Sequence, residues 1–159
     1  MNHPELSFEP NVTYVLGFAF SPALDHVLLT VYSQPKRQEY LMNGVLGKVE
    51  PEDWCYEAAM QREFAEEAGV NTELEQWFEF ADHVKSGSDS YHLVVFSAIL
   101  TEDQVQPSDF INYFWYKIER VADLLEPDIG VPGTAMYITM ALNHMNRTFS
   151  TRTIEFNES

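Results

Sequence analysis

One segment without glycine or proline limits most strongly what this chain can fold into. From Trp54 to Ala68 neither residue occurs, and Met60, Phe64 and Ala68 recur at i, i+4 and i+8, which is the spacing of one helix face. Gly69 follows at the position where helices commonly end in a left-handed residue. We therefore expect a helix over residues 54–68 with one apolar face.

The same helix carries three carboxylates on one face. Glu63, Glu66 and Glu67 are separated by three and four positions, so they are neighbours on a helix surface. Like charges at this spacing destabilise a helix by about 0.2–0.5 kcal/mol per pair, and Arg62 offsets only part of that cost. Mg²⁺ prefers carboxylate oxygens and keeps its other positions for water and substrate phosphates. The pattern therefore predicts a divalent cation site on this helix.

The overall charge narrows the class of partner. The chain has 159 residues with 9 Lys+Arg against 25 Asp+Glu, a net charge of −16, and eleven of the acids fall between Glu50 and Asp82 with Arg62 as the one base. An acidic run of this kind can also be no more than a solvated face without a functional site. Nine basic residues in so negative a protein would bind the phosphates of bulk nucleic acid poorly. A small ligand is the better expectation.

The rest of the chain predicts a single compact α+β domain over residues 1–159, with about 1–10 and 147–159 peripheral. No linker divides it, and no apolar run is long enough to cross a membrane. The N-terminus lacks the basic and apolar regions of a signal peptide, so we expect a cytoplasmic protein. Cys55 is the one cysteine, which excludes an internal disulfide. Strands are expected over 14–21 and 26–32 as a hairpin, 41–49, 77–84 and 91–100 as an antiparallel pair, and 110–118; helices are expected over 120–125 and 134–145.

One stretch of the sequence resembles a known family motif. Residues 47–51 read GKVEP, and residues 62–70 read REFAEEAGV. Together they resemble the Nudix box, G-x5-E-x7-R-E-U-x-E-E-x-G-U, where U is a bulky apolar residue, and the second half agrees at every specified position. The Asn43-Gly44 pair before the box resembles the residues found at the same place in family members that act on nucleoside triphosphates, including oxidised ones.

The motif departs from the family pattern in two places. The stretch from Gly47 to Arg62 is one residue longer than in the family, so the first acid of the box is ambiguous. Counting from Gly47 places it at Asp53, counting back from Arg62 places it at Trp54, and Glu52 or Glu57 could substitute. The glycine pair that is frequent in the family is Leu46-Gly47 here, and a leucine allows fewer loop conformations than a second glycine.

The resemblance implies an α/β/α sandwich with a mixed central sheet and a loop-helix-loop metal site. It also implies a pyrophosphohydrolase that uses Mg²⁺ or Mn²⁺ to cleave nucleoside diphosphates linked to another group. By this resemblance Glu66 and Glu67 are metal carboxylates, and Glu63 is a metal ligand or the general base. Gly47 is a metal ligand through its carbonyl, and Arg62 orients the glutamates.

Some family members take the base from a later loop. The acids of the corresponding stretch here are Glu102, Asp103 and Asp109. Lys48 is a candidate for contact with substrate phosphates, and so are Lys36 and Arg37. The last two could equally be solvated surface residues. Asn43 and Tyr40 are candidates for contact with the nucleobase. The aromatic residues that could stack on a base are Tyr32, Tyr40, Tyr91 and Trp115.

The substrate within the class stays open. Nucleoside triphosphates, ADP-ribose, NADH and dinucleoside polyphosphates all suit the chemistry, and similar proteins are often homodimers. One alternative is a Nudix module that binds a nucleotide without cleaving it, because of the extra loop residue and the missing first glutamate. Another is removal of the 5′ cap from RNA, which conflicts with the net charge of −16.

Overall fold

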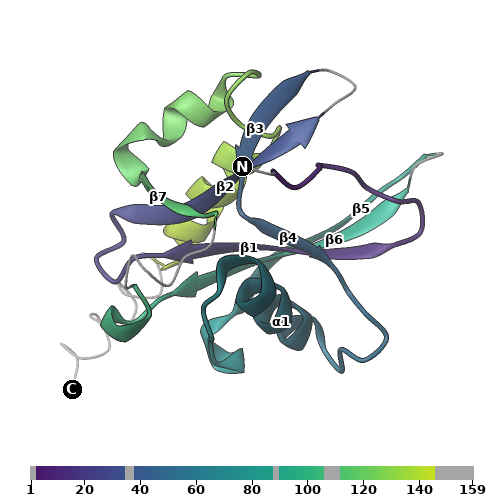
Figure 1. The fold of residues 1–159 in the computed structure, drawn as a ribbon, viewed down its shortest axis with the longest axis horizontal. Coiled ribbons are helices and arrows are strands. Elements are labelled where there is room, and N and C mark those ends of the chain that lie inside the picture. Colours follow the sequence, from purple (N-terminus) through teal and green to yellow (C-terminus); the bar gives the residue numbers. More distant parts are fainter. Residues whose placement is uncertain (1–2, 35–37, 88–89, 106–111, 146–159) are drawn as a thin grey trace, which may run out of the picture.

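The computed structural model describes residues 3–34, 38–87, 90–105 and 112–145. It has one long α-helix in the middle of the chain, a helical stretch over 134–145, and a sheet of seven strands (Figure 1). The strands are β1 (Thr13–Phe20), β2 (His26–Gln34), β3 (Glu39–Asn43), β4 (Val45–Lys48), β5 (Phe78–Lys85), β6 (Tyr91–Ile99) and β7 (Phe114–Lys117). The helices are α1 (Tyr56–Ala68) and the 3-10 segments η1 (Leu74–Gln76), η2 (Glu102–Gln104) and η4 (Ile118–Leu125).

The sheet is mixed, with strand order β3-β2-β1-β6-β5. β1 and β6 are parallel over their whole lengths, whereas β5 and β6 form the expected antiparallel pair. The hairpin expected from residues 14–32 is paired only beside its turn, where Phe20 lies opposite Val27. Beyond that pair the strands separate, because β4 and β6 take the two edges of β1 while β3 and β7 pair with β2.

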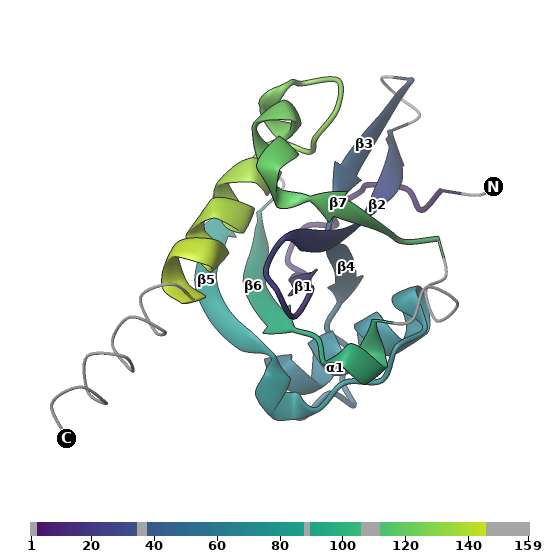
Figure 2. The ribbon, with the colours of Figure 1, turned by 90° about the vertical axis from the view of Figure 1, so that its left-hand side faces the viewer.

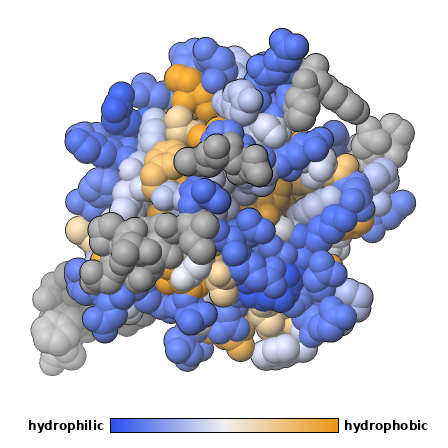
Figure 3. All heavy atoms as spheres, in the orientation of Figure 1, coloured by the Kyte–Doolittle hydropathy of each residue, from blue (hydrophilic) through white to orange (hydrophobic). Residues whose placement is uncertain are grey.

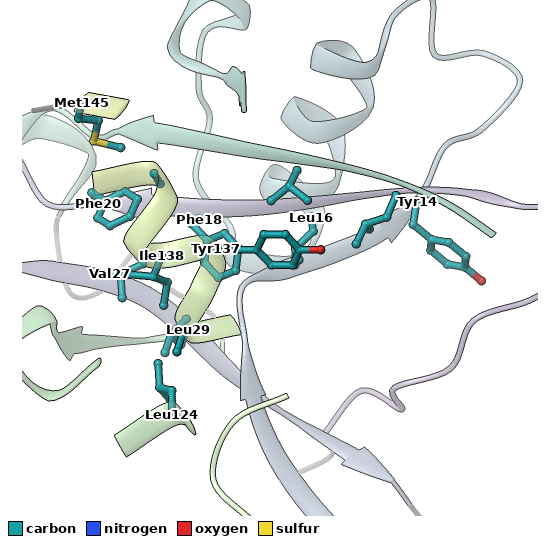
Figure 4. Packing of buried hydrophobic residues seen from close by; sticks show 14 residues of the cluster. Tyr14, Leu16, Phe18, Phe20, Val27, Leu29, Leu124, Tyr137, Ile138 and Met145 are labelled. Atoms are coloured by element: carbon teal, nitrogen blue, oxygen red, sulfur yellow. The ribbon is translucent and has the colours of Figure 1, made fainter. Parts of the chain in front are cut away.

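Helices cover both faces of this sheet (Figure 2). Alternate side chains of β1 point to opposite sides, as a pleated strand requires. Leu16 and Phe18 belong to the core beneath helix 134–145, shown in Figure 4, while Val15 and Ala19 belong to the core beneath α1. The expected mixed-sheet α+β architecture is confirmed, and β1 is buried along nearly its whole length because it separates two cores.

The N-terminal segment lies along β2 rather than apart from the domain. Leu6 N–H donates to Ser33 O, and Ser33 N–H donates to Pro4 O, each at 2.8 Å. Phe8 stacks on Tyr91 with ring centroids 4.3 Å apart. Residues 4–8 therefore run across the sheet from β2 towards β6. Within the described residues, no helix has both the length and the apolar character to span a membrane.

Candidate functional site

Helix α1 ends at Ala68, as its sequence predicts, and begins at Tyr56, two residues later than expected. Cys55 is the N-cap, and its Sγ accepts a hydrogen bond from Ala58 N–H at 3.3 Å. Gly69 ends the helix with φ 80° and donates its N–H to Ala65 O. Trp54, expected inside the helix, precedes it and is 77% exposed. The apolar face packs into the core beneath the sheet, which sets the direction of the glutamate face (Figure 1).

Glu63 lies on that helix against the backbone of β4. Its side chain belongs to the few buried charged groups, with 7% of the residue exposed. A Cβ atom added to Gly47 would lie 2.1 Å from Glu63 Cδ, so no residue other than glycine fits at this position without moving the carboxylate. Gly47 is therefore required for close approach between strand and helix, and the sequence pattern brought together two residues that are adjacent in space.

Leu46, which replaces one glycine of the usual pair, is accommodated without strain. It lies in β4 opposite Leu16, and its side chain packs against the core beneath helix 134–145. Gly47 follows it in the strand and faces the other side, towards α1. Because the strand alternates, the leucine is directed away from Glu63 and leaves the space beside Gly47 open.

Arg62 connects the loop before the helix to the glutamates. Its Nε and Nη2 donate to the Asp53 carboxylate at 3.0 and 2.8 Å, and Nη2 also donates to Lys48 O at 3.0 Å. Nη1 donates to Glu63 Oε1 at 2.9 Å and to Glu66 Oε2 at 3.3 Å. The hydrogen bonds that Arg62 donates to Asp53 raise the pKa of Arg62 further, so the guanidinium stays charged. This planar fork orients two glutamates and the end of β4 at once.

The structure brings one of the three acids considered for the first box position to Arg62. The Asp53 side chain is 6% exposed and also accepts a hydrogen bond from Glu50 N–H at 2.8 Å. Arg62 holds the pKa of this carboxyl below its usual value. Glu52 is exposed, and Glu57 lies in the first turn of α1. The acid in contact with Arg62 is therefore the one found by counting the family spacing from Gly47. On this alignment the additional residue of the loop falls between Asp53 and Arg62.

The glutamates affect one another's ionisation. Burial raises the pKa of Glu63 to about 7, with Glu66 and Glu67 adding to the rise and Arg62 opposing it. Burial and the charge of Glu66 also raise the pKa of Glu67. Burial is the main cause of both rises, and the charges of neighbouring glutamates add to them.

The donor set fits a hard divalent cation by its chemistry. It offers carboxylate oxygens from Glu63, Glu66 and Glu67 and a backbone carbonyl at Gly47, which are the ligands that Mg²⁺ and Mn²⁺ take. Within the described part of the chain, no three carboxylate, imidazole or thiol groups converge as a preformed metal site. Arg62 Nη1 instead contacts both Glu63 and Glu66.

Two of the three candidate bases of the later loop fall within the described residues. Glu102 and Asp103 belong to η2, whose Gln104 is hydrogen-bonded to Asn71 O and to Gln76, just beyond the end of α1. Both acids are exposed. Asp109, Lys36 and Arg37 lie outside the described residues.

A cavity of about 680 Å³ lies on the other side of β4, between the sheet and the start of helix 134–145. Asn43, at the end of β3, is buried in its wall. Asn43 Oδ1 accepts hydrogen bonds from Gly44 N–H at 2.8 Å and Thr134 Oγ1 at 3.0 Å. The oxygen is thus occupied, and the amide nitrogen is the end of this side chain available to a ligand.

The other expected substrate residues differ in their positions. Tyr91 lines the cavity, whereas Tyr32 is buried in the fold and Tyr40 is 62% exposed. Lys48 Nζ lies 2.6 Å from Glu9 Oε1, and this partner raises its pKa.

The sequence analysis missed several cavity residues. They come from distant parts of the chain: the N-terminal segment, β5 and helix 134–145. His83 Nε2 and the Tyr137 hydroxyl lie 2.5 Å apart there. The Pro132-Gly133 helix start was visible in the sequence, but nothing there indicated that Thr134 and Tyr137 face a cavity. The missed lining residues include Glu5, Phe8, His83, Thr134 and Tyr137.

Comparison with known proteins decides the family. The family model of the NUDIX domain matches residues 11–133, which include the strand, loop and helix just described. The chain belongs to the Nudix family. As a Nudix protein it is a hydrolase acting on nucleotide pyrophosphate bonds. A search of curated proteins finds no match.

Solved structures of other Nudix proteins share this fold. A NUDIX hydrolase from Nitrosomonas europaea superimposes with a TM-score of 0.62 at 16% identity, over 84% of this chain and 90% of the other. A protein described as an ADP compounds hydrolase gives 0.65 at 18% identity, over 88% and 76%. The NUDIX domain of Shewanella oneidensis NrtR, solved with ADP ribose, gives 0.61 at 16% identity, over 87% and 90%. At these identities the likeness establishes the Nudix fold.

Proposed function

We propose that this Nudix protein is a Mg²⁺- or Mn²⁺-dependent pyrophosphohydrolase that cleaves a phosphoanhydride bond of a small nucleotide. One observation carries the proposal: Arg62 gathers Asp53, Glu63 and Glu66 beside the strand that bears Gly47. The cavity beneath Asn43 lies on the other side of the same β3–β4 segment.

Each residue of the box has a distinct task in this reaction. Glu66 and Glu67, with the Gly47 carbonyl, would hold the cation, which when bound neutralises phosphate charge and makes water more acidic. Arg62 fixes the carboxylate positions and stays cationic throughout. Glu63, enclosed between Gly47 and Arg62, is the proposed further ligand or the general base that takes a proton from the attacking water.

The cation also accounts for how so acidic a protein accepts an anion. The net charge is −16, and hydrophilic side chains cover most of the face that carries α1 (Figure 3). Without a cation, the carboxylates would repel a polyphosphate, whereas a bound divalent ion reverses the sign of the local field. Lys48, at the end of β4, is the basic residue of the box besides Arg62 and is proposed to contact the outer phosphate once it leaves Glu9.

The substrate moiety is proposed from the wall of the cavity. Asn43 offers amide hydrogens to an acceptor such as a keto oxygen of a base, and Leu41 and Tyr91 offer apolar surface. Triphosphates, ADP-ribose, NADH and dinucleoside polyphosphates all carry a nucleoside and a pyrophosphate. One of the similar structures is described as an ADP compounds hydrolase and another was solved with ADP ribose, so these compounds belong in any substrate panel.

The test is hydrolysis of that panel with Mg²⁺ or Mn²⁺, comparing the wild type with Glu67→Gln. Glu75→Gln is the matched control, because Glu75 is an exposed acid on η1 and its change removes the same charge. Turnover of one compound that is lost in Glu67→Gln and kept in Glu75→Gln supports the proposal. Binding of a nucleotide with no turnover under either cation would overturn it in favour of a binding module.

A further inference from the structure

The chain crosses between two strand pairings at Gly44, directly before the metal-site strand. β3 pairs with β2, and β4 pairs with β1, so the backbone changes partners between Asn43 and Val45. A Cβ atom at Gly44 would lie 2.4 Å from Gly17 O, so the backbone at Gly44 packs directly against the backbone of β1. Backbone groups at such a crossing need partners other than the two ladders.

Asn43 Oδ1 accepts from Gly44 N–H, and the side chain of Tyr32 supplies two further partners. Tyr32, on β2, is 3% exposed, and its hydroxyl donates to Gly44 O at 2.8 Å and accepts from Leu46 N–H at 3.0 Å. The hydroxyl thus joins both sides of the crossing to β2. Burial raises the pKa of Tyr32 well above its usual value, so the group keeps the proton that it donates.

The crossing directly precedes the part of β4 that contacts the candidate metal site. Gly47 follows Leu46 and has no free space beside Glu63, and Lys48 O accepts from Arg62. A shift of residues 44–46 would therefore move Gly47 and the Arg62 contact together. Tyr32 itself does not line the cavity.

We propose that Tyr32 is a positioning residue, whose hydroxyl holds the Gly44–Leu46 crossing so that Gly47 and Lys48 keep their places against Glu63 and Arg62 of the proposed cation site. This inference rests on the proposed function, because it assigns Tyr32 a role in that same site. It predicts a specific kinetic signature: metal affinity and kcat depend on the hydroxyl, whereas KM for the nucleotide depends on it much less.

The first experiment compares Tyr32→Phe with the wild type and with Tyr116→Phe. Tyr116 is the matched control, because its hydroxyl donates to Arg120 O at 2.8 Å on η4, outside the metal-site strand and helix. In Tyr32→Phe we expect kcat to fall and the Mn²⁺ concentration for half-maximal binding to rise, each about tenfold or more. Mn²⁺ binding is measured directly by calorimetry, without substrate. Tyr116→Phe should keep both wild-type values.

Two outcomes would overturn the positioning role. One is a folded Tyr32→Phe with wild-type kcat and Mn²⁺ affinity, while Glu67→Gln is inactive; the proposed function would then stand without this inference. The other is a fall confined to melting temperature, which a structural role alone explains. If the wild type neither binds Mn²⁺ nor turns over any nucleotide, both the proposed function and this inference fail.

A second measurement covers the case in which Tyr32→Phe does not fold. Hydrogen exchange of the Leu46 amide is followed in the wild type with and without Mg²⁺. Because Tyr32 and the cation constrain adjacent residues, Mg²⁺ should slow exchange at Leu46 severalfold and leave the Ile118 amide, bonded to Asp25 O, unchanged. An unprotected Leu46 amide, or one indifferent to Mg²⁺, contradicts the proposal.

Discussion

Gly47 and Glu63 meet with no room for a side chain between them, since a Cβ atom at Gly47 would lie 2.1 Å from Glu63 Cδ. The strand that bears Gly47 and the helix that bears the three glutamates therefore pack directly against each other. Through this contact, residues of the box that are separate in the sequence lie together in one compact site.

The contact predicts the effect of Gly47→Ala. The methyl group must displace Glu63, so we expect kcat to fall by about two orders of magnitude and stability by roughly 1–3 kcal/mol. Urea denaturation and steady-state kinetics measure the two effects. In the double variant Gly47→Ala/Glu63→Asp the shorter acid should recover stability but not kcat. If it recovers neither, the clash with Glu63 is not the cause.

The ion pair of Asp53 with Arg62 predicts which acid completes the box. Asp53→Asn leaves the guanidinium without its main partner and should lower the free energy of unfolding by about 1–3 kcal/mol. Glu52→Gln, at an exposed position one residue earlier, should change it by less than about 0.5 kcal/mol. Thermal or urea unfolding of the two variants decides the matter. Equal effects would mean that Asp53 does not occupy the first acid position.

The raised pKa of Glu63 predicts how metal-free stability depends on pH. The folded pKa of about 7 exceeds the ordinary value of 4.5, so the folded state binds more protons between these values. The contribution of Glu63 to stability is therefore fully present below pH 4.5 and is lost as pH rises to about 7. Unfolding in EDTA should show this loss, about 3 kcal/mol for this group. Glu63→Gln should flatten the dependence; an unchanged slope would assign it to other groups.

Divalent cations should stabilise the folded protein before any substrate is added. A cation that binds only the folded state at about 100 times its Kd adds about 2.7 kcal/mol. We expect Mg²⁺ or Mn²⁺ to raise Tm by several degrees, EDTA to reverse the rise, and Glu67→Gln to abolish most of it. NaCl at equal ionic strength controls for screening of the −16 charge, and an equal rise with NaCl would argue against a specific site.

The amide of Asn43 predicts a change in substrate recognition. Asn43→Asp keeps the oxygen that accepts from Gly44 and Thr134 but removes the hydrogens offered to the cavity. We expect KM to rise about tenfold or more with a smaller change in kcat. Thr134→Val removes only the support of Asn43 and should have the milder effect on KM. Unchanged KM in Asn43→Asp would place the base elsewhere.

Local signals in the sequence predicted much of the fold. The period of the apolar residues and Gly69 predicted helix α1, and the apolar runs predicted β5 and β6 as an antiparallel pair. The hairpin of β1 and β2 was only partly right, because β1 has partners from distant parts of the chain. Such pairings depend on which edges are left free in the assembled sheet, and that is not visible in the strands themselves.

By itself the sequence determined the chemistry of this protein: three carboxylates on one helix face, a glycine before them, and the Nudix family that this spacing indicates. It could do so because the helix spacing of the carboxylates is a local property of residues near one another in the chain, and because the family motif is itself a short stretch of sequence. Only the tertiary structure decided that Asp53 joins Arg62, that Leu46 faces away from the site, and that Tyr32 holds the crossing at Gly44. Those contacts depend on packing between strands and a helix that are separate in sequence, so they exist only once the sheet is assembled.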